Sequence, residues 1–110
     1  MAIIRYTTPT VMFEYSDVNV TDITAAYLVV VQGGRSVIER DLSTATVVHN
    51  TVGQTTLNYI SWTLEQAETK KLSPSMATTI YCDWKLSDGT RGRSHKLSTP
   101  VEDTGKQEII

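Results

Sequence analysis

The segment from Ile23 to Gln32 constrains the fold most, because apolar side chains fall on both sides of its extended chain. One side carries Ala25, Tyr27, Val29 and Val31, and the other carries Ala26, Leu28 and Val30. This pattern predicts a β-strand in a central or sandwiched position. Gly33 and Gly34 follow at once, and a Gly-Gly pair permits the positive φ angles of a two-residue hairpin. We therefore expect residues 35–40 to return as an antiparallel strand.

Further short runs have the alternation that is typical of strands with one buried face. They span residues 11–15, 46–49, 55–62, 76–86 and 90–97, and the run 46–49 is the most ambiguous, with a loop expected over 50–54. Asp88-Gly89 is a tight-turn signal, so the last two runs should pair antiparallel. The apolar sides of these runs should face a common core, with Ile60 and Trp62 of the run 55–62 directed inward.

A short helix is expected between the strands that end at Trp62 and begin at Met76. Thr63 and Gln66 have the spacing of a capping box, in which each side chain bonds to the other's backbone. Leu64 and Leu72 follow at near-helical spacing and are the expected anchors of the helix against the sheets. The proline of Ser73-Pro74-Ser75 ends it.

These elements predict an all-β fold, a two-sheet antiparallel immunoglobulin-like sandwich with one short helix near residues 63–72. A chain of 110 residues has room for one such domain. We expect an N-terminal arm over residues 1–9, the β-sandwich domain over 10–99 and a C-terminal tail over 100–110. The arms carry apolar residues in an otherwise polar sequence, namely Ile3, Ile4, Ile109 and Ile110.

The composition argues against several classes of function. A net charge of −2 gives no long-range attraction for nucleic acid or an anionic membrane, so we expect neither as a partner. The first twenty residues contain no long apolar core, which predicts a soluble chain made in the cytoplasm, without membrane insertion. Cys82 is the single cysteine, and its place on an apolar strand face predicts a buried thiol.

The sequence predicts no catalytic residue, no metal site and no cofactor. His49 and His95 are the two histidines, and neither has a carboxylate or cysteine at metal-ligand spacing. Glu65 and Glu68 lie near the expected helix start, where the helix dipole explains them. Neither a nucleophile elbow nor a phosphate-binding loop is present, so we expect a protein that is not an enzyme.

Two surface features remain as binding candidates. Arg91, Arg93 and His95 alternate on one face, with Lys85 across the turn, and form a basic strip that suits an acidic partner or a nucleic-acid backbone. The simpler interpretation is that these charges protect an edge strand from unwanted pairing. Tyr81 points outward on its strand and is the candidate glycan contact, because aromatic faces stack on apolar sugar faces.

Several motifs, spread over nearly the whole chain, resemble one group of small proteins encoded in phages and prophages of gut Firmicutes. The motifs are Ile3-Ile4-Arg5, Thr7-Thr8-Pro9-Thr10, the strand that ends at Gln32-Gly33, Trp62 to Thr69, and Asp83 to Gly92. This chain departs from the group at Glu65, which stands where the group has its capping threonine. The resemblance implies an all-β virion component.

The resemblance also implies a role and a setting. It implies a non-enzymatic bacteriophage structural protein, synthesised in the host cytoplasm, that docks multivalently into the virion as a capsid decoration or a tail or baseplate component. Its partners would be other phage structural proteins in a symmetric homo- or hetero-oligomer. The candidate interface residues are Ile3, Ile4, Ile109, Ile110, Arg91, Arg93 and Lys85. The alternative is a glycan-binding or host-adhesion module, since fold alone does not select a function.

Overall fold

The computed structural model describes residues 2–74 and 76–103, and it confirms an all-β protein with one short α-helix. The elements are β1 (Ile3–Ile4), β2 (Thr10–Glu14), η1 (Val20–Asp22), β3 (Ile23–Gln32), β4 (Arg35–Asp41), η2 (Leu42–Thr44), β5 (Thr46–Val52), β6 (Thr55–Thr63), α1 (Gln66–Thr69), β7 (Thr78–Leu86), β8 (Arg91–Arg93), β9 (Leu97–Thr99) and β10 (Val101–Glu102).

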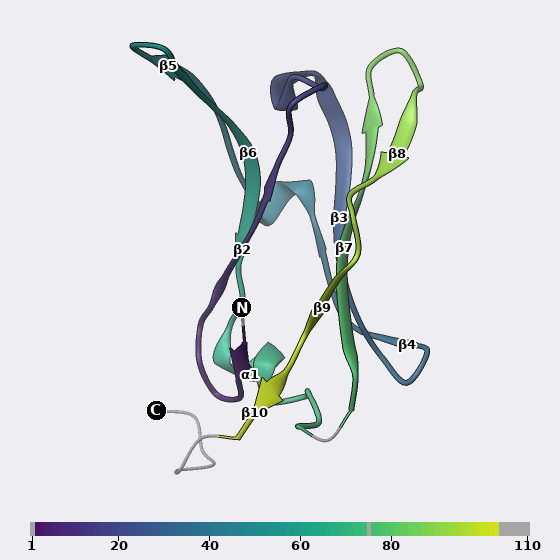
Figure 1. Ribbon diagram of the computed structural model, residues 1–110. Helices are drawn as coiled ribbons and strands as arrows, with labels where there is room; N and C mark the ends of the chain where they lie inside the picture. Colours follow the sequence, from purple (N-terminus) through teal and green to yellow (C-terminus); the bar gives the residue numbers. More distant parts are fainter. Residues whose placement is uncertain (1, 75, 104–110) are drawn as a thin grey trace.

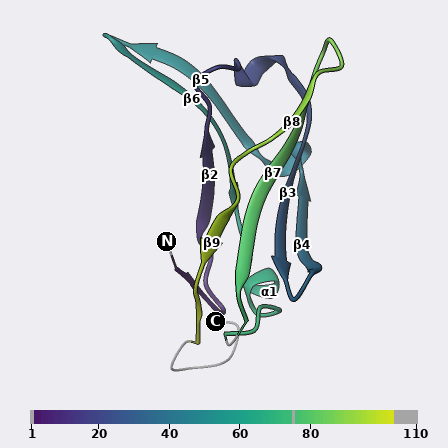
Figure 2. The same cartoon turned by 45° about the vertical axis from the view of Figure 1, so that its right-hand side comes forward.

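The strands form two main antiparallel sheets that face each other (Figure 1). One sheet has the order β2-β6-β5, and the other has the order β4-β3-β7-β8, with β9 also paired to β7. Helix α1 lies at the end of the molecule opposite to the tip of the β5–β6 hairpin (Figure 2). β3 pairs on both sides, with β4 and β7, so its predicted central position is confirmed.

Trp62 of β6 is fully buried and joins the two sheets. Its ring meets Phe13 of β2 edge to face, with centroids 6.1 Å apart, and its indole N–H donates to the Asp41 carbonyl at the end of β4, at 2.9 Å. The inward directions predicted for Ile60 and Trp62 are thus correct, and so is the buried thiol of Cys82. The remaining core side chains are Ile3, Val11, Val20, Ile23, Ala26, Leu28, Val30, Ile38, Leu64, Leu72, Ile80 and Val101.

Two hairpins turn on two residues each. Gly33 and Gly34 have φ angles of 58° and 74° and join β3 to β4, which confirms the first hairpin. The second joins β5 to β6 through Gly53, at φ 62°, and Gln54. The loop predicted over residues 50–54 was wrong, because β5 continues to Val52. Every residue of β5 except Val48 is exposed, so no burial pattern marked this strand in the sequence.

The amide of Asn58 ties this second hairpin to the body of the protein, with three residues between Asn58 and the turn. Its Nδ2 donates to the carbonyls of Tyr15 (2.8 Å) and Val18 (2.6 Å), and its Oδ1 accepts from the Val20 N–H at 3.0 Å. His49, opposite Asn58 in the β5–β6 register, places its Nδ1 3.0 Å from the same Oδ1. One side chain therefore ties β6 to the whole connection between β2 and β3.

The start of α1 differs from the sequence prediction. The cap is Glu65, whose N–H donates to the Glu68 carboxylate at 2.9 Å, so the capping roles predicted for Thr63 and Gln66 were wrong. Thr63 is still the last residue of β6, and its hydroxyl lies 3.0 Å from that of Thr10. Because the strand extends this far, the helix begins later and is one turn long. Leu64 and Leu72 are both buried, as expected for its anchors.

The strand predicted over residues 90–97 is two strands separated by residues 94–96, which begin with Ser94. This residue takes both backbone bonds of Cys82: its hydroxyl accepts from the Cys82 N–H and its own N–H donates to the Cys82 carbonyl, each at 2.8 Å. Both β8 and β9 pair antiparallel with β7, as expected. At this break the Ser94 hydroxyl takes the place of a backbone acceptor. The hydropathy pattern of the sequence does not reveal such a substitution.

The described parts of both terminal segments belong to the same core as residues 10–99. β1 pairs in parallel with β10, through Ile3 with Val101, and both side chains are buried. Arg5 adds an ion pair to Asp103 at 2.6 Å. The expected boundaries at residues 9 and 100 therefore do not separate Ile3 or Val101 from the domain.

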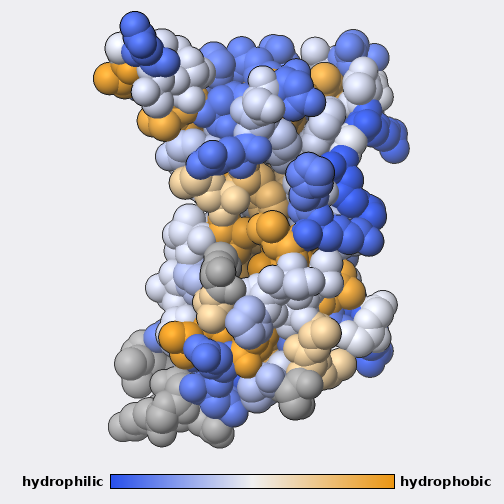
Figure 3. Space-filling view, in the orientation of Figure 1, coloured by the Kyte–Doolittle hydropathy of each residue, from blue (hydrophilic) through white to orange (hydrophobic). Residues whose placement is uncertain are grey.

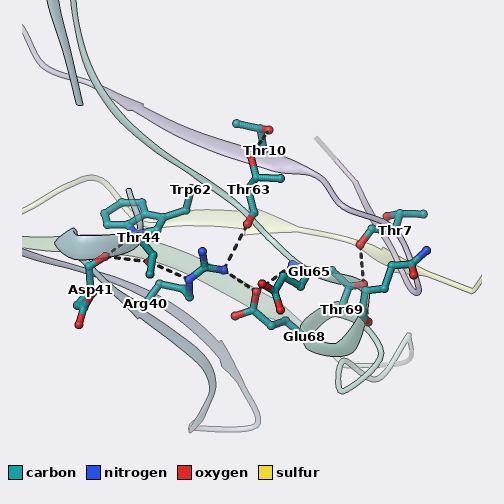
Figure 4. Close-up of polar contacts among 11 residues, drawn as sticks. Thr7, Thr10, Arg40, Asp41, Thr44, Trp62, Thr63, Glu65, Glu68 and Thr69 are labelled. Carbon is teal, nitrogen blue, oxygen red and sulfur yellow. Dashed lines mark hydrogen bonds and ion pairs between the residues drawn. The ribbon is translucent and has the colours of Figure 1, made fainter. Parts of the chain in front are cut away.

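A polar cluster joins the two sheets to α1 (Figure 4). The Arg40 guanidinium, on β4, donates to the Glu68 carboxylate at 2.6 Å, to the Thr44 hydroxyl at 3.0 Å and to the Thr63 carbonyl at 3.3 Å. The Arg40 and Glu68 side chains are 17% and 16% exposed. Breaking a pair so shielded from water costs more stability than breaking an exposed one, because the partner that remains is a poorly solvated charge.

We predict that Glu68→Ala lowers the free energy of unfolding by about 2–3 kcal/mol, since it leaves Arg40 unpaired and removes the α1 cap. The matched control is Asp103→Ala, which removes the more exposed Arg5 pair and should cost less than about 1 kcal/mol. Urea denaturation of both variants measures the difference. Equal losses would show that the Arg40 cluster does not hold α1 in place.

Candidate functional site

The outer surface of β3, β7 and β8 brings the predicted basic residues together. In the β7–β8 register Arg93 lies opposite Asp83, and Arg91 lies opposite Lys85, while Tyr27 of β3 lies on the other side of Asp83. Together they line a shallow depression of about 720 Å³ with Ala25, Trp84 and Gly92. We call this surface the β8 face, defined by Tyr27, Asp83, Lys85, Arg91 and Arg93.

Arg93 has partners within the protomer. Its guanidinium forks onto the Asp83 carboxylate, at 2.5 and 3.1 Å, and lies over the ring of Tyr81, 4.2 Å from the centroid. Asp83 raises the pKa of Arg93 above its ordinary value, so the guanidinium stays charged. The Lys96 ammonium is also within 5.7 Å of the Tyr81 centroid. Cations therefore cover part of the ring that a sugar was expected to contact.

Lys85 and Arg91 are arranged differently from Arg93. They are direct cross-strand neighbours on the same face, and neither has an ion-pair partner within residues 2–74 and 76–103. Like charges directly opposite each other destabilise a sheet. An anionic group that binds between them would remove this repulsion and add two charge-assisted contacts. The geometry thus favours a carboxylate or another anion as the group this face binds.

Tyr27 is the residue of this face that sequence reasoning missed. Its ring is 53% exposed, although it stands in the middle of the central strand. The alternation placed Tyr27 on the same side as Ala25, Val29 and Val31, which suggested a covered face. The small side chain of Ala25, which lines the same depression, leaves room beside the ring, and this neighbour could have signalled an exposed aromatic residue.

Gly92 allows β8 to lie close to β7. It is the cross-strand partner of Trp84, and a Cβ added to Gly92 would lie 2.2 Å from Cζ2 of that indole. The same indole meets Tyr15 edge to face at 6.3 Å. The absence of a side chain at Gly92 therefore sets the position of Arg91 and Arg93 relative to β7.

We predict that Gly92→Ala displaces β8 and lowers the free energy of unfolding by about 1–3 kcal/mol, because the new methyl group overlaps the indole of Trp84. Thermal denaturation and tryptophan fluorescence measure the loss and the displacement. The double variant Gly92→Ala/Trp84→Leu should recover part of the loss, since the smaller side chain makes room. A single variant as stable as the parent would contradict this packing.

The interface candidates in the two terminal segments are not part of the β8 face. Ile3 is buried within the protomer, so its side chain holds β1 to the core, whereas Ile4 is 40% exposed. Ile109 and Ile110 lie outside the described residues. The interface role of Ile4 stays a prediction, and the structure places it at the β1–β10 end of the molecule, away from β8 (Figure 1).

The described ranges contain no group of three or more His, Cys, Asp or Glu side chains arranged to hold a metal ion. Burial raises the pKa of the Cys82 thiol, and burial likewise raises that of the neighbouring Tyr15 hydroxyl. Both groups therefore stay protonated at neutral pH, and Cys82 behaves as a core side chain. None of the helices in residues 2–74 and 76–103 has the length and hydropathy needed to cross a bilayer.

The comparisons with known proteins do not assign the chain to a family. No protein-family model, curated protein or solved structure matches the chain. The β8 face and the sequence motifs are therefore the observations from which a function is argued.

Proposed function

We propose that this chain is a non-enzymatic structural protein of a bacteriophage virion, with an immunoglobulin-like sandwich fold. In this proposal it docks multivalently into the particle as a capsid decoration or as a tail or baseplate component. Its partners are other phage structural proteins, in a symmetric homo- or hetero-oligomer. The sequence motifs described above support the phage setting, and the β8 face supports docking as the activity.

The observation that carries the docking proposal is the opposed pair of Lys85 and Arg91. Each lacks an ion-pair partner within the described residues, and together they repel, so the free protomer retains electrostatic energy that an acidic partner surface would release. Tyr27 stands beside them as an exposed aromatic anchor of the kind enriched at interfaces. All three side chains project from paired strands, so their backbone positions are fixed before a partner arrives.

A symmetric particle makes such a small surface sufficient. A contact of a few side chains is weak by itself, but many copies that dock on one lattice act together, and their avidity exceeds the affinity of each contact. In this proposal Arg93, which the sequence predicted as an interface residue, holds Asp83 and Tyr81 in place at the border of the face. Ile4 and the tail residues Ile109 and Ile110 remain candidates for additional contacts.

We predict that particles purified from a producing host contain this chain in a fixed ratio to the major capsid or tail protein. Quantitative mass spectrometry measures the ratio, and electron microscopy with a label near the C-terminus gives the position. Label on the shell identifies a decoration, and label at the tail identifies a tail or baseplate component. Particles that lack the chain altogether would refute the virion proposal.

We also predict that the double reversal Lys85→Glu/Arg91→Glu lowers incorporation into particles at least about tenfold, because two favourable charges become repulsive toward an acidic partner. The matched control is Lys70→Glu/Lys71→Glu, which makes the same change in net charge at exposed positions beside α1. Quantitative blotting of purified particles compares the variants. Equal incorporation of both would refute docking through the β8 face.

A second candidate function is glycan binding in host adhesion, and the exposure of Tyr27 favours it. The open ring lies next to the hydrogen-bonding side chains of Asp83 and Arg91, a combination that suits the apolar face and the hydroxyls of a sugar. A glycan array followed by Tm shifts tests it. Loss of a shift in Tyr27→Ala identifies this ring as the platform, whereas loss in Tyr81→Ala identifies the ring that the sequence predicted.

A further inference from the structure

Strand β5 is an edge strand without the usual protection against pairing with another chain. Lys, Pro and other charges normally protect such edges. The edge strands β4 and β8 carry Arg35, Glu39, Arg40, Asp41, Arg91 and Arg93, β2 carries Glu14, and β9 is three residues long. By contrast, residues 46–63, which form the whole β5–β6 hairpin, contain no Asp, Glu, Lys, Arg or Pro in a chain that is 20% charged.

The backbone groups that this edge offers follow from the hydrogen bonds of β6. The Asn58 carbonyl accepts from the Tyr15 N–H, so the backbone of Asn58 faces β2 and that of Tyr59 faces β5. Tyr59 is paired with Val48, whose groups therefore face β6. Because the direction alternates along a strand, the N–H and C=O groups of Val47, His49 and Thr51 point away from the sheet. No strand in the described ranges covers them.

The side chains around this edge also favour a strand partner. Val52 is 65% exposed and Leu57 is 44% exposed, both on the outward side of the hairpin, and five of the seven residues of β5 are Val or Thr. β-branched residues favour strand pairing. Figure 3 shows hydrophobic atoms where the hairpin projects from the body at the upper left. The hairpin thus exposes apolar surface next to unpaired backbone.

We propose that β5 pairs antiparallel with β5 of a second copy of this chain, about a two-fold axis at His49. In this register Val47 lies opposite Thr51 of the other copy, and His49 lies opposite His49. Each of these pairs exchanges two hydrogen bonds, so all the outward groups of the three residues are used. The result is one continuous sheet that runs from β2 of one copy to β2 of the other.

A second copy fits this edge because β5 contains no Asp, Glu, Lys or Arg, in either copy. A charged partner strand would lose hydration beside residues 46–52 without gaining a counter-charge, whereas two copies of β5 bring no Asp, Glu, Lys or Arg side chains opposite each other. A two-fold contact is also closed, so the pairing ends at a dimer and does not continue into fibres. The use of this dimer in a particle rests on the proposed function, but its formation does not.

The first test is the association of purified full-length protein, measured by sedimentation over a range of concentrations. We expect a dimer, and we expect Asn50→Lys, which places a charge on the edge, to raise its dissociation constant at least about tenfold. Thr51→Pro, which removes one outward N–H, should do the same. The control Ser98→Lys makes a comparable change on exposed β9 and should leave the dimer unchanged.

The second test examines the register by disulfide formation. His49→Cys places two thiols opposite each other, with Cα atoms about 5.5 Å apart, which is within disulfide range. Val52→Cys is the matched control: its thiol is more exposed, but the two copies would lie about 20 Å apart along the strands. Mild oxidation should give covalent dimers of His49→Cys far faster than of Val52→Cys.

A folded protein that stays monomeric at every concentration, or equal oxidation rates of the two cysteine variants, would overturn the β5 pairing. Circular dichroism and Tm verify that each variant is folded. A monomer that still enters particles would refute the pairing and leave the virion proposal intact. A dimer whose chain is absent from every particle would support the β5 pairing and refute the virion proposal.

Discussion

The burial of Trp62 between two sheets is the contact on which the rest of the structure depends. Its ring fills the space beside Phe13, and its indole N–H satisfies the carbonyl of Asp41, so one side chain provides both core volume and a hydrogen bond between the sheets. A buried indole N–H without a partner would cost stability, so the bond to Asp41 favours this position of the ring. The end of β4 must therefore stay next to β6, and this contact brings Arg40 within reach of Glu68 and of α1.

The two proposed interaction surfaces follow from this arrangement. The sheet that contains β7 presents the β8 face, where charges are opposed and a polar partner is favoured. The sheet that contains β6 ends in an uncharged edge, where backbone pairing is favoured. Because they belong to different sheets, one copy can use both at the same time, as a component of a symmetric assembly requires.

Sequence reasoning predicted the features that depend on burial and on turn chemistry. The central strand, the Gly33-Gly34 hairpin and the inward side chains Ile60, Trp62 and Cys82 all follow from alternation or from glycine. It failed where a polar side chain replaced backbone pairing, as at Ser94 and Glu68, and where an exposed strand has no buried side, as in β5. For the β8 face it predicted the basic residues but not Tyr27, because apolar alternation alone does not show whether another element covers that side of the sheet.

The amide of Asn58 also determines how the β5–β6 hairpin can move. Its bonds to Tyr15, Val18 and Val20 clamp the hairpin at one level, and the residues between Asn58 and the turn have no comparable bond to the body among the described contacts. The outer part of the hairpin, from Asn58 to the turn, is therefore hydrogen-bonded to the body at one level among the described residues. Force applied at the tip of the hairpin would be carried to the connection between β2 and β3. This connection leads into β3, the strand that contains Tyr27.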